Sequence, residues 1–191
     1  AVSNKYLFDH TGLEGLYIQP AAGDSGQCLG NTYFGLYSFD TAHLKRSALS
    51  VYQGKEYTEE EMVKALEGGG FTYTKLGSDE LIKRTAQAIA DGKIVGWFQG
   101  RSEIGPRALG NRSILADPRN QEMKDLLNTR VKHRENFRPF APSVLEEDAP
   151  NWFDLSVPAP YMILNARVLQ PKKIPATTHV DSSARIQTVN K

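Results

Sequence analysis

The 191-residue chain has little of several things that define special classes of protein. It contains one cysteine, Cys28, and two tryptophans. A single thiol cannot form an internal disulfide, so a disulfide-stabilised scaffold is excluded and a reducing compartment such as the cytoplasm is favoured. No stretch approaches the roughly 18 consecutive apolar residues of a membrane-spanning helix, and the N-terminus lacks the basic-then-apolar pattern of a signal peptide. We expect a cytoplasmic protein with no membrane partner.

Charge is nearly balanced over the whole chain, with 23 Lys and Arg against 22 Asp and Glu. One segment departs from this balance. Residues 99–143 hold nine basic and five acidic side chains, a net charge of +4, whereas the remainder is −3. Locally concentrated positive charge favours a defined anionic ligand. Nucleic-acid binding is less expected, because such domains are usually basic throughout.

The first half of the chain shows two helices with clear boundary signals. Thr58 and Glu61 form a capping box at the start of one helix, and Gly68 begins a glycine triplet that ends it. Ser78 begins a second helix, which Gly92 ends. Upstream, residues 13–18 predict a short strand, followed by a glycine-bearing loop and a further helix. Residues 40–57 are interpreted as a connecting region.

The second half predicts short strands mixed with one helix. The strands are expected at residues 93–98, 114–116, 140–145, 161–164 and 168–169. Asp117 and Pro118 supply a cap and a first-turn proline for a helix that runs through Val131. This order lacks the strict alternation of a doubly wound sheet, so the fold class is expected to be α/β of the α+β kind, with a mixed sheet.

Two basic loops are the main candidates for chemistry. Residues 100–113 form a loop punctuated by glycine and proline, with an arginine at every fifth or sixth position, and residues 132–140 repeat this pattern after the predicted helix. Guanidinium groups match phosphate and carboxylate oxygens. The alternatives are a solvated loop with ion pairs to Glu103 and Asp117, and a helix C-terminus that simply favours cations.

Other reactive side chains carry weaker signals. His179 could act as a general base beside Asp181, although a structural hydrogen bond is the commoner reason for such a pair. Cys28 has no neighbouring base or metal-ligand spacing. The chain begins without a methionine and ends in a polar segment, so we expect it to be a piece of a longer polypeptide.

Three long motifs carry a specific resemblance. GRSEIGPRALGNRSILADPRNQEMKDLLN, VKHRENFRPFAPSVLEE and THVDSSARIQTV resemble, in order and spacing, the C-terminal region of the O-carbamoyltransferases of nodulation and antibiotic biosynthesis. QPAAGDSG resembles the last metal- and nucleotide-site loop of that family's actin-like ATPase domain. The resemblance covers nearly the whole chain.

The resemblance implies three regions. Residues 1–45 would be the C-terminal tail of the actin-like carbamoyl-transfer domain, residues 46–75 a connecting region with a helix, and residues 76–191 a YrdC-like domain truncated at its C-terminus. It also implies an ATP-dependent carbamoyltransferase. The YrdC-like domain would cleave carbamoyl phosphate and form carbamoyl adenylate from ATP. The actin-like domain, the implied partner in the same polypeptide, would pass the carbamoyl group to a hydroxyl of a small molecule.

Site residues are carried over from the family motifs. Catalysis is assigned to Lys132, Arg107 and Arg138. Contacts to the phosphates and the adenylate are assigned to a larger set, comprising Arg101, Arg107, Arg112, Lys132, Arg134, Arg138 and Arg185. Asp24 would bind a divalent metal, Mg²⁺ or iron, although the chain lacks the paired-histidine motif that supplies its co-ligands in the family. Such fixed cations suit a transition state with charge on phosphoryl oxygens.

One rival function from another class stays open. A YrdC-like fold with a basic concave surface also suits a non-catalytic module that binds RNA or another anion. Few aromatic residues lie among the arginines, which disfavours stacking on single-stranded nucleic acid. Binding that weakens steeply with salt would identify such a module.

Overall fold

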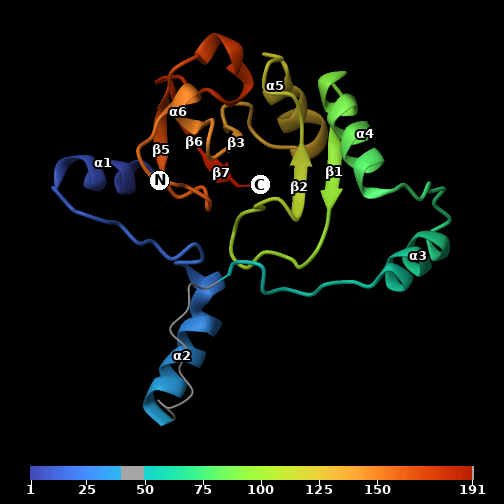
Figure 1. The fold of residues 1–191 in the computed structure, drawn as a ribbon, viewed down its shortest axis with the longest axis horizontal. Coiled ribbons are helices and arrows are strands. Elements are labelled where there is room, and N and C mark those ends of the chain that lie inside the picture. Colours follow the sequence, from blue (N-terminus) through green and yellow to red (C-terminus); the bar gives the residue numbers. More distant parts are fainter. Residues whose placement is uncertain (40–49, 191) are drawn as a thin grey trace. The chain divides into compact units, whose positions relative to one another are not determined.

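The computed structural model of the chain describes residues 1–39 and 50–190, and its elements are drawn in Figure 1. Residues 40–49 include the start of the predicted connecting region and the boundary at residue 45, which therefore lie outside the described residues. The chain divides into two compact units. The first contains residues 1–16, 75–97 and 113–191, and the second contains residues 17–74 and 98–112. The predicted division into three regions, with boundaries after residues 45 and 75, stays a prediction.

The first unit is built on small sheets. Strand β3 (Ser143–Leu145) pairs in parallel with β7 (Gln187–Val189). Strand β5 (Asn165–Val168) is central in a three-stranded antiparallel sheet, between β4 (Phe153–Asp154) and β6 (Ser183–Arg185). Strands β1 (Val95–Phe98) and β2 (Arg112–Leu115) form a further pair, whose arrows run in opposite directions in Figure 1. Mixed parallel and antiparallel pairing with interspersed helices confirms the predicted fold class.

Helices of the first unit connect and cover these strands. They are α1 (Val2–His10), α4 (Ser78–Ala90), α5 (Met123–Leu127) and α6 (Ala149–Trp152), with single turns η4 (Pro171–Lys173) and η5 (Pro175–Thr177). The π-helical turn η3 (Asn128–Lys132) continues α5 directly. Helix α1 is tied to the unit by the Asn4 amide, which donates to the carbonyl of Ile163 at 2.8 Å. No helix in the described ranges combines the length and apolar character that crossing a bilayer requires.

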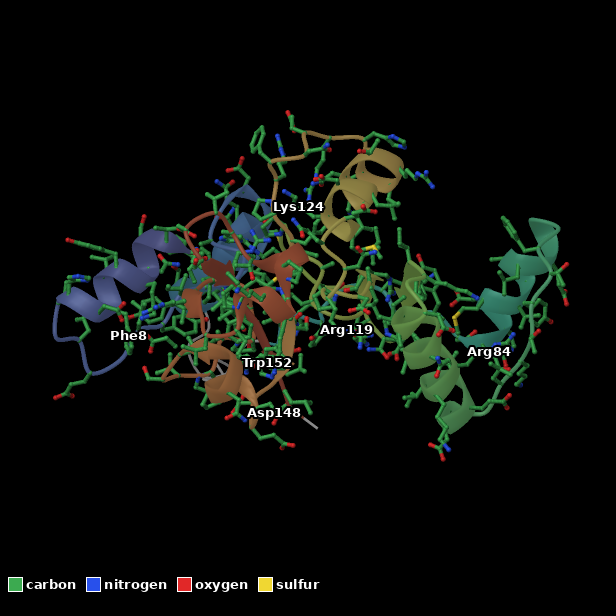
Figure 2. The ribbon with its side chains drawn as sticks, turned by 90° about the horizontal axis from the view of Figure 1, so that it is seen from above. Phe8, Arg84, Arg119, Lys124, Asp148 and Trp152 are labelled. Carbon is green, nitrogen blue, oxygen red and sulfur yellow. The ribbon has the colours of Figure 1, made fainter. Side chains whose placement is uncertain are left out.

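Two apolar clusters form the core of the first unit. The larger lies on the three-stranded sheet and contains the buried side chains of Phe153, Ala166, Val168, Ile174, Ala184 and Ile186. Trp152, labelled in Figure 2, packs against its edge. The smaller cluster joins Met123 and Leu127 of α5 to Ala176, with Phe140 packed against it. This second cluster fixes the end of α5, where the basic segment begins.

The second unit holds η1 (Asp24–Gly26), α2 (Gln27–Phe39), α3 (Glu59–Gly68) and the loop at residues 98–112. Helix α3 begins as predicted: Thr58 Oγ1 accepts from the backbone N–H of Glu61, and the Glu61 carboxylate accepts from that of Thr58. The loop is tied to residues 51–54 by backbone hydrogen bonds from Ile104 to Val51 and from Gly54 to Ser102.

Three local expectations were wrong. Residues 13–18 form no strand, because no strand in the described part of the chain pairs with them. Asp117 caps no helix: its carboxylate accepts from the backbone N–H and the guanidinium of Arg119, and α5 begins only at Met123. Residues 161–164 are not extended as a strand, because Met162 has a left-handed φ of 55° and the strand starts at residue 165.

Candidate functional site

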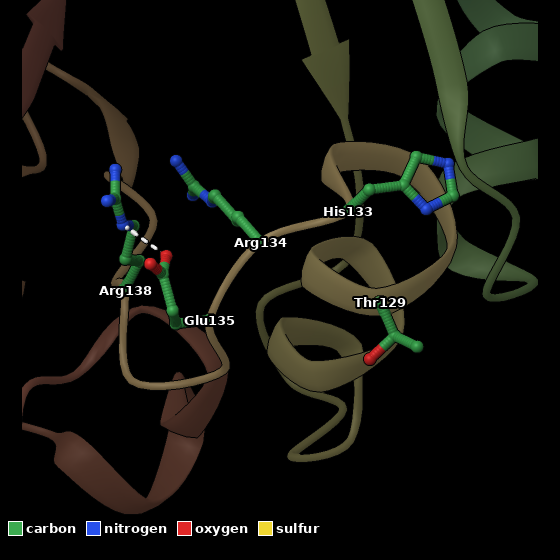
Figure 3. Close-up of a pocket in the computed structure, with 5 residues that line it drawn as sticks. All are labelled: Thr129, His133, Arg134, Glu135 and Arg138. Atoms are coloured by element: carbon green, nitrogen blue, oxygen red, sulfur yellow. Dashed lines mark ion pairs between the residues drawn. The ribbon is translucent and has the colours of Figure 1, made fainter.

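A pocket in the first unit is lined by residues that follow α5. Its volume is about 640 Å³, and its lining comprises Thr129, His133, Arg134, Glu135 and Arg138. Figure 3 shows Arg134 and Arg138 extending in the same direction, while His133 extends away on the other side of the backbone. Two of the predicted anion-binding arginines are thus brought together, and this group is called the arginine pocket below.

The backbone beside the arginine pocket is unusual. The π-helical turn η3 is followed by His133, which adopts the left-handed conformation with φ 46° and ψ 52°. A π-turn is rare and occurs often at functional sites, and the left-handed conformation is costly for a residue other than glycine. Together they turn the chain sharply after Lys132, so that Arg134 leaves the helix on a different path.

Arg134 is restrained by three contacts, two with Asn128 and one with Phe140. Its Nε donates to Asn128 Oδ1 at 2.7 Å, and its backbone N–H donates to the Asn128 carbonyl at 3.0 Å. Its guanidinium carbon lies 4.8 Å from the ring centre of Phe140, which packs against the smaller core cluster. A guanidinium restrained in this way loses little conformational entropy when it binds an anion.

Arg138 is paired within the pocket. Its Nε lies 2.8 Å from the Glu135 carboxylate, an ion pair that Figure 3 marks with a dashed line. A hydrogen bond within Glu135 itself and the charge of Arg138 hold the pKa of the Glu135 carboxyl below its ordinary value of 4.5. Glu135 is therefore ionised at neutral pH, and an incoming anion must compete with it for Arg138.

The other predicted residues of the first unit lie on separate elements. Lys132 is exposed at the end of η3, where it forms no ion pair with any residue that the structure describes. Arg185 ends β6, opposite Asn165 of β5. His179 precedes that strand, and its Nδ1 lies 3.1 Å from Ser183 Oγ. The Asp181 carboxylate accepts from the backbone N–H of the same serine, Ser183, at 3.0 Å.

Burial and two charged neighbours shift the pKa of the His179 ring. Burial lowers the pKa of the imidazole, and the charge of Arg185 lowers it further, while Asp181 acts in the opposite direction. Its Nε2 atom is buried and has no hydrogen-bond partner in the described part of the chain. The ring is therefore neutral at pH 7, which is compatible with either of the roles considered for it.

The loop of the second unit is organised by Glu103. Its Oε1 accepts from three backbone N–H groups, those of Leu109 at 2.8 Å, Asn111 at 2.7 Å and Arg112 at 3.2 Å. Burial opposes ionisation, but these bonds together lower the pKa of the Glu103 carboxyl. Glu103 therefore accepts hydrogen bonds from backbone N–H groups. The alternative of a solvated basic loop had predicted a surface ion pair for this carboxylate.

Three predicted arginines lie on this loop in different settings. Arg112 donates to the carbonyls of Gln99 and Gly100, and its guanidinium carbon lies 3.5 Å from the ring centre of Phe98. Its guanidinium is thus engaged by the protein itself. Arg101 lies 3.6 Å from the carboxylate of Glu56. Arg107 differs: it is half-buried, and its buried Nε has no hydrogen-bond partner among the residues described.

Asp24 is the residue that the resemblance assigns to a metal. Asp24 is exposed in η1. Within residues 1–39 and 50–190, no three His, Cys, Asp or Glu side chains gather in a way that could hold a metal ion. Asp24 therefore has no such group of co-ligands within the part of the chain that the structure describes.

Sequence reasoning missed Asn128, the side chain that organises the arginine pocket. It is fully buried, with 0% of its surface exposed. A signal was present, because Asn128 follows Leu127 on a helix whose apolar residues face the core. An asparagine at such a position needs internal hydrogen-bond partners.

Comparisons with known proteins place these residues in a family context. The family model described as carbamoyltransferase C-terminus matches residues 86–191, which include the arginine pocket, Arg107 and Arg185. An uncharacterized protein of Synechocystis is 39% identical over 99% of the chain. Nodulation protein NolNO of Sinorhizobium fredii is 42% identical over 94% of the chain. The 3′-hydroxymethylcephem-O-carbamoyltransferase of Amycolatopsis lactamdurans is 39% identical over 91% of the chain. The chain spans 35%, 27% and 32% of the length of these curated relatives, about a third.

Proposed function

The chain belongs to the carbamoyltransferase C-terminal family, and on that premise we propose that it activates carbamoyl groups for an ATP-dependent O-carbamoyltransferase. Water hydrolyses carbamoyl phosphate to carbamate and inorganic phosphate. A carbamate oxygen then attacks the α-phosphorus of ATP, which gives carbamoyl adenylate and releases pyrophosphate. The carbamoyl group finally passes to a hydroxyl oxygen of a small molecule, and AMP leaves.

The observation that supports this proposal most directly is the arginine pocket. It lies within the matched region, and it presents two guanidinium groups on the same side, one of them restrained before any ligand arrives. Both substrates carry several negative charges. Each charge-assisted hydrogen bond contributes about 1.5–3 kcal/mol, so three or four on one phosphate suffice for micromolar binding.

Roles follow for the remaining residues. Lys132 and Arg138 neutralise charge that develops on the phosphoryl oxygens, and Arg134 orients the anion. Arg107 and Arg185 contribute further phosphate or adenylate contacts. A YrdC-like domain and an actin-like partner domain in the same polypeptide complete the proposal. A divalent metal at Asp24 would need co-ligands from outside the described residues.

The test is made on the intact polypeptide. We expect pyrophosphate to be released from ATP only when carbamoyl phosphate is present, and carbamoyl phosphate to bind with micromolar affinity in titration calorimetry. Release that does not depend on carbamoyl phosphate would contradict the proposal. Tight RNA binding with a log–log salt slope of several units would instead support the binding-module alternative.

Glu135 gives a prediction within this proposal. The pKa of Glu135 is lowered, so its carboxylate is ionised at neutral pH and competes with a bound anion for Arg138. This competition is lost only as the pH falls below 4.5. Glu135→Gln removes the competing charge. Because an exposed ion pair is weak, we expect inorganic phosphate to bind only roughly two- to fivefold more tightly at pH 7. Titration calorimetry of the intact polypeptide measures the change.

Glu122→Gln is the matched control for this measurement, since it removes another exposed acid of the same unit that does not line the pocket. It should leave the affinity unchanged. A weaker affinity in Glu135→Gln would show that Glu135 holds Arg138 in position for the anion, contrary to competition.

A further inference from the structure

Asn128 occupies the boundary between the core and the arginine pocket. It follows Leu127, a member of the smaller core cluster, and it is one of the two largest side chains that are fully buried among the described residues. A buried amide without partners is costly, so each of its polar atoms must be accounted for.

The amide of Asn128 meets this requirement with atoms of the pocket segment. Oδ1 accepts from Arg134 Nε at 2.7 Å. Nδ2 donates to the carbonyl of Arg138 at 2.9 Å and, more weakly, to that of Asn136 at 3.4 Å. Its backbone carbonyl accepts from Arg134, at 3.0 Å, and from His133. One side chain therefore contacts both arginines of the pocket, one through its guanidinium and the other through its backbone.

We infer that Asn128 is a positioning residue, which sets the Arg134 guanidinium and the Arg138 backbone for binding of a phosphate-bearing substrate. This inference rests on the proposed function. Asn128 does not line the pocket, so it acts through the arginines.

The chemistry requires an asparagine at this position. Aspartate would keep the acceptor for Arg134 but lose both donors, and a carboxylate oxygen would then face the carbonyls of Asn136 and Arg138. Leucine would match the volume but leave Arg134 Nε without its partner. Only a carboxamide accepts at one end and donates at the other while fitting the same space.

A double-mutant cycle on the intact polypeptide tests the inference, with carbamoyl phosphate as the probe in titration calorimetry. We expect Asn128→Ala to weaken binding about tenfold in the wild-type background, but less than threefold in Arg134→Ala, because the residue to be positioned is already absent. Asn128→Asp, of the same shape, should fall between the wild type and Asn128→Ala. Asn151→Ala, an exposed asparagine of the same unit outside the pocket, should change nothing.

The outcomes separate this inference from the function on which it rests. If Asn128→Ala weakens binding equally in both backgrounds, the effect is a general loss of folding and the positioning role is wrong. Melting temperatures of all variants check this independently. If Arg134→Ala alone leaves carbamoyl phosphate binding unchanged, the site assignment in the proposed function fails, and the inference fails with it.

Discussion

Replacing Lys132 or Arg138 by alanine in the intact polypeptide is expected to slow carbamoyl adenylate formation at least tenfold. Attack on the α-phosphorus builds negative charge on its oxygens. Lys132 is the last residue of the π-helical turn and Arg138 follows that turn, and both lie in the matched region. Loss of one charge-assisted contact costs about 1.5–3 kcal/mol, and 1.4 kcal/mol corresponds to a factor of ten in rate. Carbamoyl-phosphate-dependent release of pyrophosphate measures the effect.

Matched controls for this experiment exist on the same element. Arg130 lies on η3 between Asn128 and Lys132 and is exposed like Lys132, but the family motifs assign it no contact with the substrates. Arg130→Ala should therefore retain the parental rate, so that a general loss of positive charge is separated from loss of a contact. Arg138→Lys keeps the charge but loses the planar fork, and its rate should be intermediate. Parental rates in both Lys132→Ala and Arg138→Ala would show that the catalytic assignment is wrong.

The second large effect is expected at Glu103. Glu103→Ala removes the acceptor of three backbone N–H groups in the loop that carries Arg107. A buried donor left without an acceptor costs about 1–3 kcal/mol. We expect a loss of about 2 kcal/mol in the free energy of unfolding, which lowers the melting temperature by roughly 4–8 °C. Because Arg107 moves with the loop, the KM for carbamoyl phosphate should also rise.

Glu103→Gln separates the hydrogen bonds from the charge. The amide oxygen can still accept from the loop, so its stability should lie between those of the wild type and Glu103→Ala. The pKa of Glu103 is lowered in the folded state, so the stabilisation is present above the ordinary value of 4.5 and is lost as the pH falls through the lowered pKa. Thermal unfolding at several pH values should show the wild type losing its advantage over Glu103→Gln in that acidic range. Equal stability of all three proteins at pH 7 would show that the loop does not depend on Glu103.

Local elements were predicted well where the signal lies within one or two turns of chain. The capping box of Thr58 and Glu61 is present at the start of α3. Helix α4 spans Ser78–Ala90, and Gly92 follows it with a positive φ of 79°. Strand β1 lies inside the predicted run at residues 93–98. Each of these features depends on backbone groups a few residues apart, which local residue preferences describe directly.

Elements that depend on distant partners were predicted poorly. Residues 13–18 form no strand, since none of the strands within residues 1–39 and 50–190 pairs with them. Asp117 had two possible partners nearby, the N-terminus of a helix and the guanidinium of Arg119. In the structure it forms the ion pair, with 2.6 Å between its Oδ2 and Arg119 Nη2. The strand expected over residues 140–145 is confined to Ser143–Leu145, because Pro139 and Pro142 have no N–H to contribute to a ladder.

The sequence by itself determined which side chains are candidates for anion chemistry, because charge and the planar geometry of arginine belong to the residue type. It determined the family as well, since the order and spacing of long motifs are properties of the chain. Only the tertiary structure decided how each arginine is used: Arg112 is engaged by carbonyls, Arg138 pairs with Glu135, and Arg134 is held by the buried amide of Asn128. These differences arise because folding brings each arginine together with its partners. A guanidinium forms a hydrogen bond only when an acceptor lies within about 3 Å, and residue preferences along the sequence do not predict such distances.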